Sequence, residues 1–351
     1  MGWRKKGTMY HSHDNAPKNR MRDAWMSFLP ESFDHVRPAR GPLRPIGLYL
    51  PSWENLELPG YLAKEIAPGQ LVGAERDLDR LPDVIDRAQG IRLIAGSVLD
   101  AAEILMRERS PRLWFANVDL EGGYDSHAAE ILSLFRLLPP NGDDAAHLAV
   151  TSYAARVHGI ANGIEHASKF ASGIDDLDQV VTQLGIMERR YAIIAGMLPC
   201  AEAKPITHLC RELGFLWWLV IGMGLMDRSG SAYGTYDNAY LRDAISPGIR
   251  RIRDSLKDTR STKAFRLTRD RGLAEALGRR TVTMWPTAFR HFLYYSPQHQ
   301  PMQTWFVRFY AVDHEDGRTV QDLLRQVWDL AFRTPLTYIS SEGMEVTINN
   351  P

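Results

Sequence analysis

Cysteine is scarce in this sequence. Among 351 residues there are two, Cys200 and Cys210. A zinc site built from four cysteines is therefore excluded, and two cysteines are too few for the disulfide framework that stabilises many small secreted domains. We expect the chain to work in a reducing, cytoplasmic compartment.

The sequence also lacks an excess of charge of either sign, because 42 lysines and arginines balance 42 aspartates and glutamates. No overall field draws the chain to nucleic acid or to an anionic membrane, so any such contact must come from a local patch. The most apolar stretch, residues 215–226 (FLWWLVIGMGLM), is too short to span a bilayer and indicates a buried core helix or strand. The first residues lack the apolar region of a signal peptide. These absences predict a protein without membrane contact.

What is present is enough apolar material for a sizeable core, since 44% of the residues are hydrophobic. Residues 1–41 differ from the rest: they are polar, basic and punctuated by prolines. We expect a basic, poorly ordered N-terminal arm there, either a solvated tail or a contact for nucleic acid or a partner chain.

From Pro45 onward, short apolar runs alternate with helical patterns, which is typical of a parallel α/β sheet. The predicted strands are Ile46–Leu50, Leu71–Glu75, Ile91–Ala95, Leu113–Val118 and His147–Thr151. The predicted helices between them are Leu56–Ile66, Leu78–Ala88, Val98–Arg107 and His127–Leu138. Short connections of this kind favour a doubly wound, Rossmann-like α/β sheet over residues 42–153.

The rest of the chain divides into two parts. Residues 154–279 carry apolar residues at helical spacing and predict an all-helical insertion. Residues 280–351 return to strand patterns, with TVTMWP, then FRHFLYYS and MQTWFVRFYAV as an antiparallel hairpin, and a closing helix over Val320–Phe332. His291 and His299 flank the predicted hairpin turn, for which a surface position is expected; the alternative is that this hairpin forms one wall of a ligand pocket.

The turn after the first strand, in IGLYLPSWEN, contains no glycine. A dinucleotide-binding unit would place a glycine-rich turn there, so a nicotinamide-linked oxidoreductase is disfavoured. Pro51 fixes the exit from the strand, Ser52 and Glu54 form a polar turn, and Asn55 is expected to cap the following helix.

Acidic residues at strand ends are the main chemical signal. Glu75 closes the second strand about twenty residues after the turn, where a carboxylate can accept hydrogen bonds from a ribose diol. The alternative is a structural carboxylate that pairs with Arg76 or Arg80.

The fourth strand runs into NVDLEGGY, residues 117–124. Asp119 and Glu121 are candidates for a general base at the carboxyl end of the sheet, where α/β proteins bind ligands. Tyr124 is a candidate for stacking on a base. Asn117 begins this segment.

Taken together, this layout resembles a class I S-adenosylmethionine-dependent methyltransferase. Within that family it is most similar to divergent methyltransferase-like proteins of phages and bacterial mobile elements, in which LPxxExL replaces the glycine-rich motif and DxxG follows the fourth strand. Both patterns occur here, as LPSWENL from Leu50 and DLEG from Asp119.

The resemblance implies S-adenosylmethionine as cofactor and covers residues 45–153 and 289–312. The implied cofactor-binding residues lie at the ends of the first four strands: Pro51, Ser52, Glu54, Asn55, Glu75, Arg76, Gly96, Ser97, Val98 and Asn117. The implied catalytic residues are Asp119, Glu121 and Tyr124, and no metal is implied.

Two family patterns are missing. The proline pair of amino-methyltransferases does not follow the fourth strand, and the Pro-Cys nucleophile of cytosine C5 enzymes is absent from that loop. Enzymatic activity therefore stays open. The alternative is a catalytically inactive, methyltransferase-like structural or nucleic-acid-binding subunit of a larger assembly.

Nucleic acid is the expected acceptor because residues 248–272 form the strongest basic segment of a neutral chain. The predicted contacts in it are basic side chains, Arg250, Arg251, Arg253, Lys257, Arg260 and Lys263. Three aspartates dilute the segment, so a solvated helix is the alternative. Protein partners are also left open.

Overall fold

The computed structural model describes residues 14–33, 44–51, 54–108, 113–120, 124–138, 145–153, 159–197, 205–225, 267, 271–278, 281–282, 284–296, 300–312 and 316–350. Its strands are β1 (Gly47–Tyr49), β2 (Leu71–Glu75), β3 (Arg92–Ala95), β4 (Phe115–Leu120), β5 (Ala146–Tyr153), β6 (Met284–Tyr295), β7 (Pro301–Ala311), β8 (Leu336–Ile339) and β9 (Glu345–Ile348). Its helices are α1 (Ala16–Phe28), α2 (Leu58–Ala63), α3 (Leu81–Arg87), α4 (Val98–Met106), α5 (Ala128–Leu137), α6 (Gly159–Gly173), α7 (Leu177–Met197), α8 (Pro205–Leu225), α10 (Arg271–Gly278) and α11 (Val320–Arg333).

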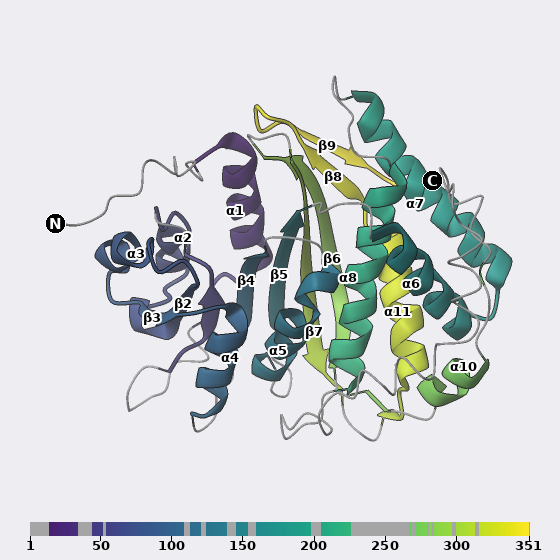
Figure 1. The fold of residues 1–351 in the computed structure, drawn as a ribbon, viewed down its shortest axis with the longest axis horizontal. Helices are drawn as coiled ribbons and strands as arrows, with labels where there is room; N and C mark the ends of the chain where they lie inside the picture. The colour runs from purple at the N-terminus through teal and green to yellow at the C-terminus, as the bar shows by residue number, and fades with distance from the viewer. Residues whose placement is uncertain are drawn as a thin grey trace.

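The described strands form one mixed, mostly parallel sheet in the order β3-β2-β1-β4-β5-β7-β6-β8-β9 (Figure 1). Strands β1 to β5 are parallel to their neighbours. Strand β7 is antiparallel to both β5 and β6, whereas β8 runs parallel to β6 and β9 closes the sheet antiparallel to β8. The architecture is therefore α/β, as predicted.

Helices cover both faces of the sheet, and alternation along the strands divides the core accordingly. Phe115 of β4 belongs to the apolar cluster beneath α1 and α2, whereas its neighbours Ala116 and Val118 belong to the cluster beneath α4, α5 and α8. In Figure 1, α1 stands on one side of the central strands, and α6, α8 and α11 stand on the other. Both faces are thus buried, which explains the nearly continuous apolar runs of β1 and β2.

The sequence predictions for residues 45–153 are confirmed. All five strands and four helices are present, and no end differs by more than three residues from the prediction. Residues 215–225, for which a buried core helix or strand was expected, form the second half of α8, and the closing helix is α11.

Two predictions about the last third of the chain need correction. The segments TVTMWP and FRHFLYYS are not separate strands, because residues 284–295 form the single strand β6 with a register shift between Pro286 and Ala288. A surface position for His291 is wrong, since its side chain is fully buried. No pattern in the sequence predicted β8 or β9.

The expected N-terminal arm is wrong for residues 14–33. Asn15 caps α1 by accepting a hydrogen bond from the Lys18 backbone N–H at 3.1 Å. Met21, Trp25 and Leu29 then fall on one face of the helix at i, i+4 spacing and are buried against the sheet. This segment is therefore part of the core. Residues 1–13 and 34–43 lie outside the described residues.

Within the predicted helical insertion, the described residues form α6, α7, α8 and α10, and these helices pack into the main core. Residues of α6, α7 and α8 share one buried apolar cluster with β4, β5 and β7. Gly222 lets α8 approach α5 so closely that a Cβ atom would collide with the ring of Phe135. Among the described helices, none is both long and apolar enough to cross a membrane.

Candidate functional site

The predicted site residues lie at the carboxyl edge of the parallel strands. The strand order reverses between β1 and β4, since β2 and β3 lie on one side of β1 while β4 and β5 lie on the other. In open α/β sheets this reversal opens a crevice beyond the strand ends, and ligands bind there. The structure brings Pro51, Glu75, Ser97 and Asp119 to this one edge.

The turn after β1 is held by buried contacts. Pro51 packs against β2 so tightly that a Cβ on Gly73 would lie 2.8 Å from its Cγ. Asn55 adopts the left-handed conformation, with φ of 50°, and its side chain accepts a hydrogen bond from the Tyr49 hydroxyl at 2.7 Å and donates one to the Arg87 carbonyl at 2.9 Å.

The prediction that Asn55 caps the next helix is wrong, because α2 begins after Glu57 without a side-chain cap. The amide of Asn55 instead ties the turn to the end of α3. Glu54 is partly exposed beside it, and Ser52 lies outside the described residues.

Glu75 ends β2 with its carboxylate half-buried. Its Oε1 accepts a hydrogen bond from the Asp77 backbone N–H at 2.7 Å. Burial raises the pKa of this carboxyl, and the backbone hydrogen bond works against that rise. The expected alternative, an ion pair with Arg76 or Arg80, is not found among the described residues: Arg80 contacts Asp77 at 3.1 Å instead.

The loop after β3 is a helix start. The Ser97 side chain accepts a hydrogen bond from the Asp100 N–H at 3.2 Å, and the Asp100 carboxylate accepts one from the Ser97 N–H at 2.7 Å. This reciprocal capping box opens α4. Gly96 allows the close approach of Asp100, and Val98 points into the core. The residues predicted to lie near adenine thus have a structural role of their own.

Strand β4 contributes two polar side chains at its end. The Asn117 side chain lies beside the Tyr61 hydroxyl and opposes the rise that burial causes in the pKa of that phenol. Asp119 is 42% exposed, and its carboxylate meets the Lys18 ammonium of α1 at 3.0 Å. Arg22, one turn further along α1, contacts Glu57 at 2.9 Å. The N-terminal half of α1 therefore supplies two cations to this acidic edge of the sheet.

The stacking role predicted for Tyr124 is not supported by its position. The ring is buried against Phe215 of α8, with centroids 4.8 Å apart, and its hydroxyl donates to the Gln303 carbonyl at 2.9 Å. An enclosed ring cannot stack on a base in solution. Glu121 lies outside the described residues, as do Arg250, Arg251, Arg253, Lys257, Arg260 and Lys263.

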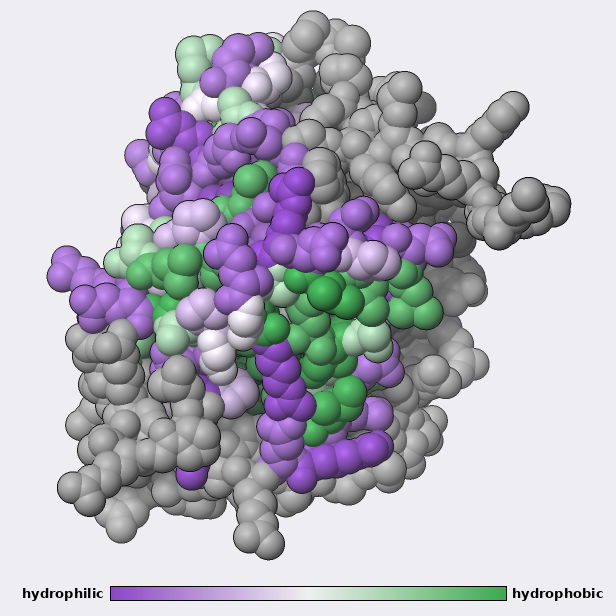
Figure 2. Space-filling view, turned by 90° about the vertical axis from the view of Figure 1, so that its left-hand side faces the viewer, coloured by the Kyte–Doolittle hydropathy of each residue, from purple (hydrophilic) through white to green (hydrophobic). Residues whose placement is uncertain are grey.

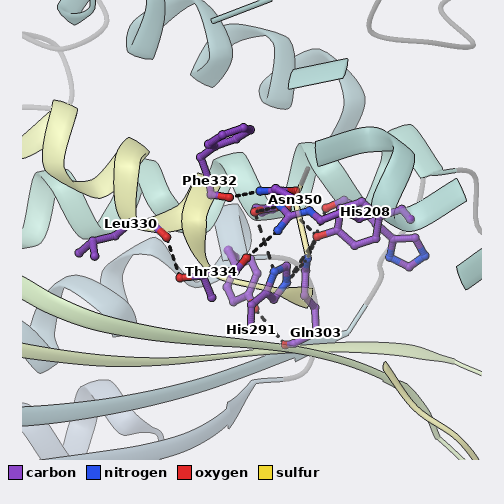
Figure 3. Close-up of polar contacts among 11 residues, drawn as sticks. His208, His291, Gln303, Leu330, Phe332, Thr334 and Asn350 are labelled. Atoms are coloured by element: carbon purple, nitrogen blue, oxygen red, sulfur yellow. Dashed lines mark hydrogen bonds and ion pairs between the residues drawn. The ribbon is translucent and has the colours of Figure 1, made fainter. Parts of the chain in front are cut away.

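Sequence reasoning missed a buried polar network where α7 and α8 pack on β6 and β7 (Figure 3). Glu212 of α8 is fully enclosed. Its carboxylate accepts hydrogen bonds from the Arg190 guanidinium at 3.1 Å and the Tyr191 hydroxyl at 2.8 Å. Arg190 also donates to the Thr334 carbonyl at 2.8 Å. Burial raises the pKa of Glu212, while Arg190 and Tyr191 work against that rise.

Two histidines in this network are held neutral. In Figure 3, His291 and Gln303 project from the strands toward the helix that carries His208. The Gln303 amide lies 2.9 Å from His291 Nε2, and the His291 ring stacks on Trp305 at 3.9 Å between centroids. Burial lowers the pKa of His208 to about 3 and that of His291 well below its ordinary value. Isolated polar residues on otherwise apolar helix faces were the available signal for this network.

A cavity of about 510 Å³ lies away from the predicted crevice, between α1 and strands β6, β8 and β9. Its lining includes Arg20, Asp23, Arg290 and Glu345, and none of the predicted catalytic or cofactor-binding residues. The described residues contain no group of three or more histidine, cysteine, aspartate or glutamate side chains that could hold a metal ion.

The surface beside the crevice is apolar at its centre. Figure 2 views the molecule from the side of α2, α3 and β3 and shows hydrophobic residues surrounded by hydrophilic ones. The exposed apolar side chains near these elements include Leu62, Leu78 and Ile85, at 42%, 66% and 55%. This face of the described chain offers apolar contact beside the ends of β2 and β3.

Known proteins were compared with this chain at the level of family models, curated sequences and solved structures. No protein-family model matches this chain, and no curated protein matches it. Among solved structures, a "possible exported protein" from Bordetella parapertussis is similar at 14% identity, over 84% of this chain and 68% of the other, with a TM-score of 0.30.

Proposed function

We propose that this chain is an S-adenosylmethionine-binding methyltransferase whose acceptor is a nucleic acid. One observation carries the proposal: Glu75 presents a half-buried carboxylate, without an ion pair among the described residues, at the carboxyl end of β2 beside the reversal of strand order. Such a carboxylate suits a ribose diol. Five parallel strands completed by an antiparallel hairpin agree with the resemblance noted in the sequence.

The donor set fits this cofactor in part. Glu75 would hold the ribose hydroxyls, and the turn from Pro51 to Asn55 would border the methionine portion. Ser97 and Val98 would border the adenine. When bound, the cofactor supplies a methyl group on a sulfonium, so the chain itself has to position the acceptor and exclude water. Asp119, exposed at the end of β4, would take up the proton released by the acceptor.

A nucleic-acid acceptor is proposed from the charge of two segments of the chain. It rests on the basic segment of residues 248–272 and on the basic N-terminal residues, most of which lie outside the described chain. A methyl-transfer assay with labelled cofactor and single-stranded and duplex DNA and RNA tests this part separately from cofactor binding.

Titration calorimetry with S-adenosylmethionine and S-adenosylhomocysteine tests the cofactor site. We expect micromolar binding to the unaltered protein and a loss of at least about tenfold in affinity for Glu75→Gln, because a charge-assisted pair of hydrogen bonds is removed. Glu103→Gln is the matched control, since Glu103 is an exposed carboxylate on α4. Absence of heat with folded protein contradicts the proposal.

A second function, a non-catalytic scaffold of this fold, is favoured by one set of contacts. The Asn55 amide, the Asn117 side chain and the Asp119 carboxylate are each engaged by other parts of the chain. A scaffold would show no cofactor binding while retaining nucleic-acid affinity that weakens steeply with salt.

A further inference from the structure

Helix α8 carries two adjacent charged residues, of which one is in an ion pair within the described chain and the other is not. Arg211 and Glu212 are neighbours in the sequence, but successive residues of a helix point about 100° apart. Glu212 faces α7 and is taken by Arg190 and Tyr191. Arg211 is therefore left without the carboxylate next to it.

Arg211 is nearly buried and has no ion pair in the described part of the chain. It is 8% exposed. Its one hydrogen-bond contact is from Nη1 to the Nδ1 of His208, at 3.4 Å. Buried charges are normally paired, because an isolated charge in a low-dielectric interior costs several kcal/mol. Arg211 is thus a buried charge without an ion pair among the described residues, unlike Glu212 on the same helix.

The groups around Arg211 do not compensate its charge. Burial lowers the pKa of its guanidinium to about 10, so it remains charged at neutral pH. The groups that oppose this decrease are Tyr124, Tyr191, Cys210 and Tyr295, and among the described residues no carboxylate acts with them. Burial raises the pKa of all three tyrosines, which are therefore neutral at pH 7.

Tyr295 adds a second donor to the same place. It ends β6 at the edge where β4 and β5 also end, and it packs on the face of the sheet covered by α8. Its phenol is partly buried, and its hydroxyl has no hydrogen bond among the described residues. Arg211 lies on α8, which contacts β6, and its guanidinium lowers the pKa of this phenol.

We propose that Arg211 and Tyr295 form an anion subsite that binds one oxyanion, a carboxylate or a phosphate, of a ligand at the carboxyl edge of the sheet. A guanidinium fork offers two parallel N–H donors to such a group, and the phenol adds a third. Some polar atoms of the described chain are fully enclosed and have no hydrogen-bond partner, and Arg190 Nε is one of them. The guanidinium nitrogens of Arg211 do not belong to this group. Nε and Nη2 of Arg211 have no hydrogen-bond partner among the described residues, so these two atoms are not fully enclosed.

The proposal is tested by thermal unfolding of the full chain in chloride, sodium acetate and inorganic phosphate at matched pH and ionic strength. We expect the Tm to rise by about 2 °C or more above the chloride value at ten times the dissociation constant of the anion that binds. A rise with phosphate alone indicates a phosphate subsite, and a rise with acetate indicates a carboxylate subsite.

Variants separate binding from structure. Arg211→Met should abolish the anion-dependent rise and should leave the Tm in chloride unchanged or higher, because it removes an uncompensated buried charge. Tyr295→Phe should reduce the rise. Arg190→Met should lower the Tm in chloride because it leaves Glu212 unpaired, and Arg325→Met, which alters an exposed pair with Asp175, should keep the anion response.

Three results would overturn the proposed subsite. The first is that the Tm of the unaltered protein is the same in all three salts. The second is that Arg211→Met keeps the anion-dependent rise in Tm, and the third is that its Tm in chloride falls as far as that of Arg190→Met. Because no S-adenosylmethionine is present in this experiment, the subsite and the proposed methyl transfer fail or stand independently.

Discussion

At the scale of single residues, the loop after β4 shows how a side chain's neighbours decide its role. Tyr124 follows a strand end and two glycines, a sequence context that suggests a reachable aromatic ring. In the fold, α8 lies over that loop, and the ring packs on Phe215 instead. Residue type and strand position were readable from the sequence, but a covering helix some ninety residues away was not.

The buried hydroxyl of Tyr124 gives a first prediction. Tyr124→Phe should lower the free energy of unfolding by about 1–2 kcal/mol, because the Gln303 carbonyl loses its donor in a dry environment. Urea unfolding measures this difference. Tyr310→Phe, on the partly exposed end of β7, should change stability by less than about 0.5 kcal/mol. Equal effects in both variants would mean that the Tyr124 hydroxyl is solvated.

His147 gives a prediction for the dependence of stability on pH. Burial, with a smaller contribution from Arg308, lowers its pKa from 6.5 to about 4 in the folded chain. The unfolded chain therefore binds more protons between these values, so stability is full above pH 6.5 and decreases as the pH falls toward 4.

The contribution of His147 over that window is on the order of 3 kcal/mol. His147→Gln should flatten the pH profile of the free energy of unfolding between pH 4.5 and 7 by that order, measured by urea titration at several pH values. His208 and His291 add slope of the same sign, so the variant should reduce the slope without removing it. A variant with the slope of the unaltered protein would contradict the buried, neutral state of His147.

At the scale of elements, the strands and helices of residues 45–153 could be predicted because each obeys a simple period. Parallel strands that are buried on both faces have nearly continuous apolar sequences, and the helices between them carry apolar residues at helical spacing. Strands β8 and β9 are four residues each, and β9 has a mostly exposed pattern, so neither stood out from a loop.

Helix α1 was missed for a different reason. Its apolar stripe is narrow, and the basic, proline-containing residues around it resemble a solvated tail. What holds it is a tertiary contact: Trp25 packs against Phe306 at 5.2 Å between centroids, and its indole N–H donates to the Tyr61 hydroxyl at 3.1 Å. Tertiary packing thus overrides a composition that indicates disorder.

This packing predicts the effect of one truncation. Trp25→Ala should destabilise the protein by about 3–5 kcal/mol, because it removes a ring that is 1% exposed and leaves a cavity over the sheet. Asp23→Ala, on the exposed side of the same helix, is the control and should change stability by less than about 0.5 kcal/mol. If Trp25→Ala lowered the free energy of unfolding by less than about 1 kcal/mol, residues 14–33 would instead behave as a loosely attached arm.

At the scale of the whole molecule, the sequence predicted the α/β class and the edge at which the candidate residues meet. The strand order and the parallel pairing put the ends of β1, β2, β3 and β4 in one row. The sequence could not predict the partners of those residues. The contacts of Lys18 with Asp119, of the Arg87 carbonyl with Asn55 and within the network around Glu212 join segments that only the completed fold brings together.

The most direct test of the account is a crystal structure of the protein with S-adenosylhomocysteine. We predict ligand density beyond the carboxyl ends of β1 and β2, with the ribose hydroxyls within hydrogen-bonding distance of the Glu75 carboxylate and the Asp119 carboxylate facing open solvent. Density elsewhere, or crystals grown with excess ligand that contain none at this edge, would contradict the central claim that this edge is a cofactor site.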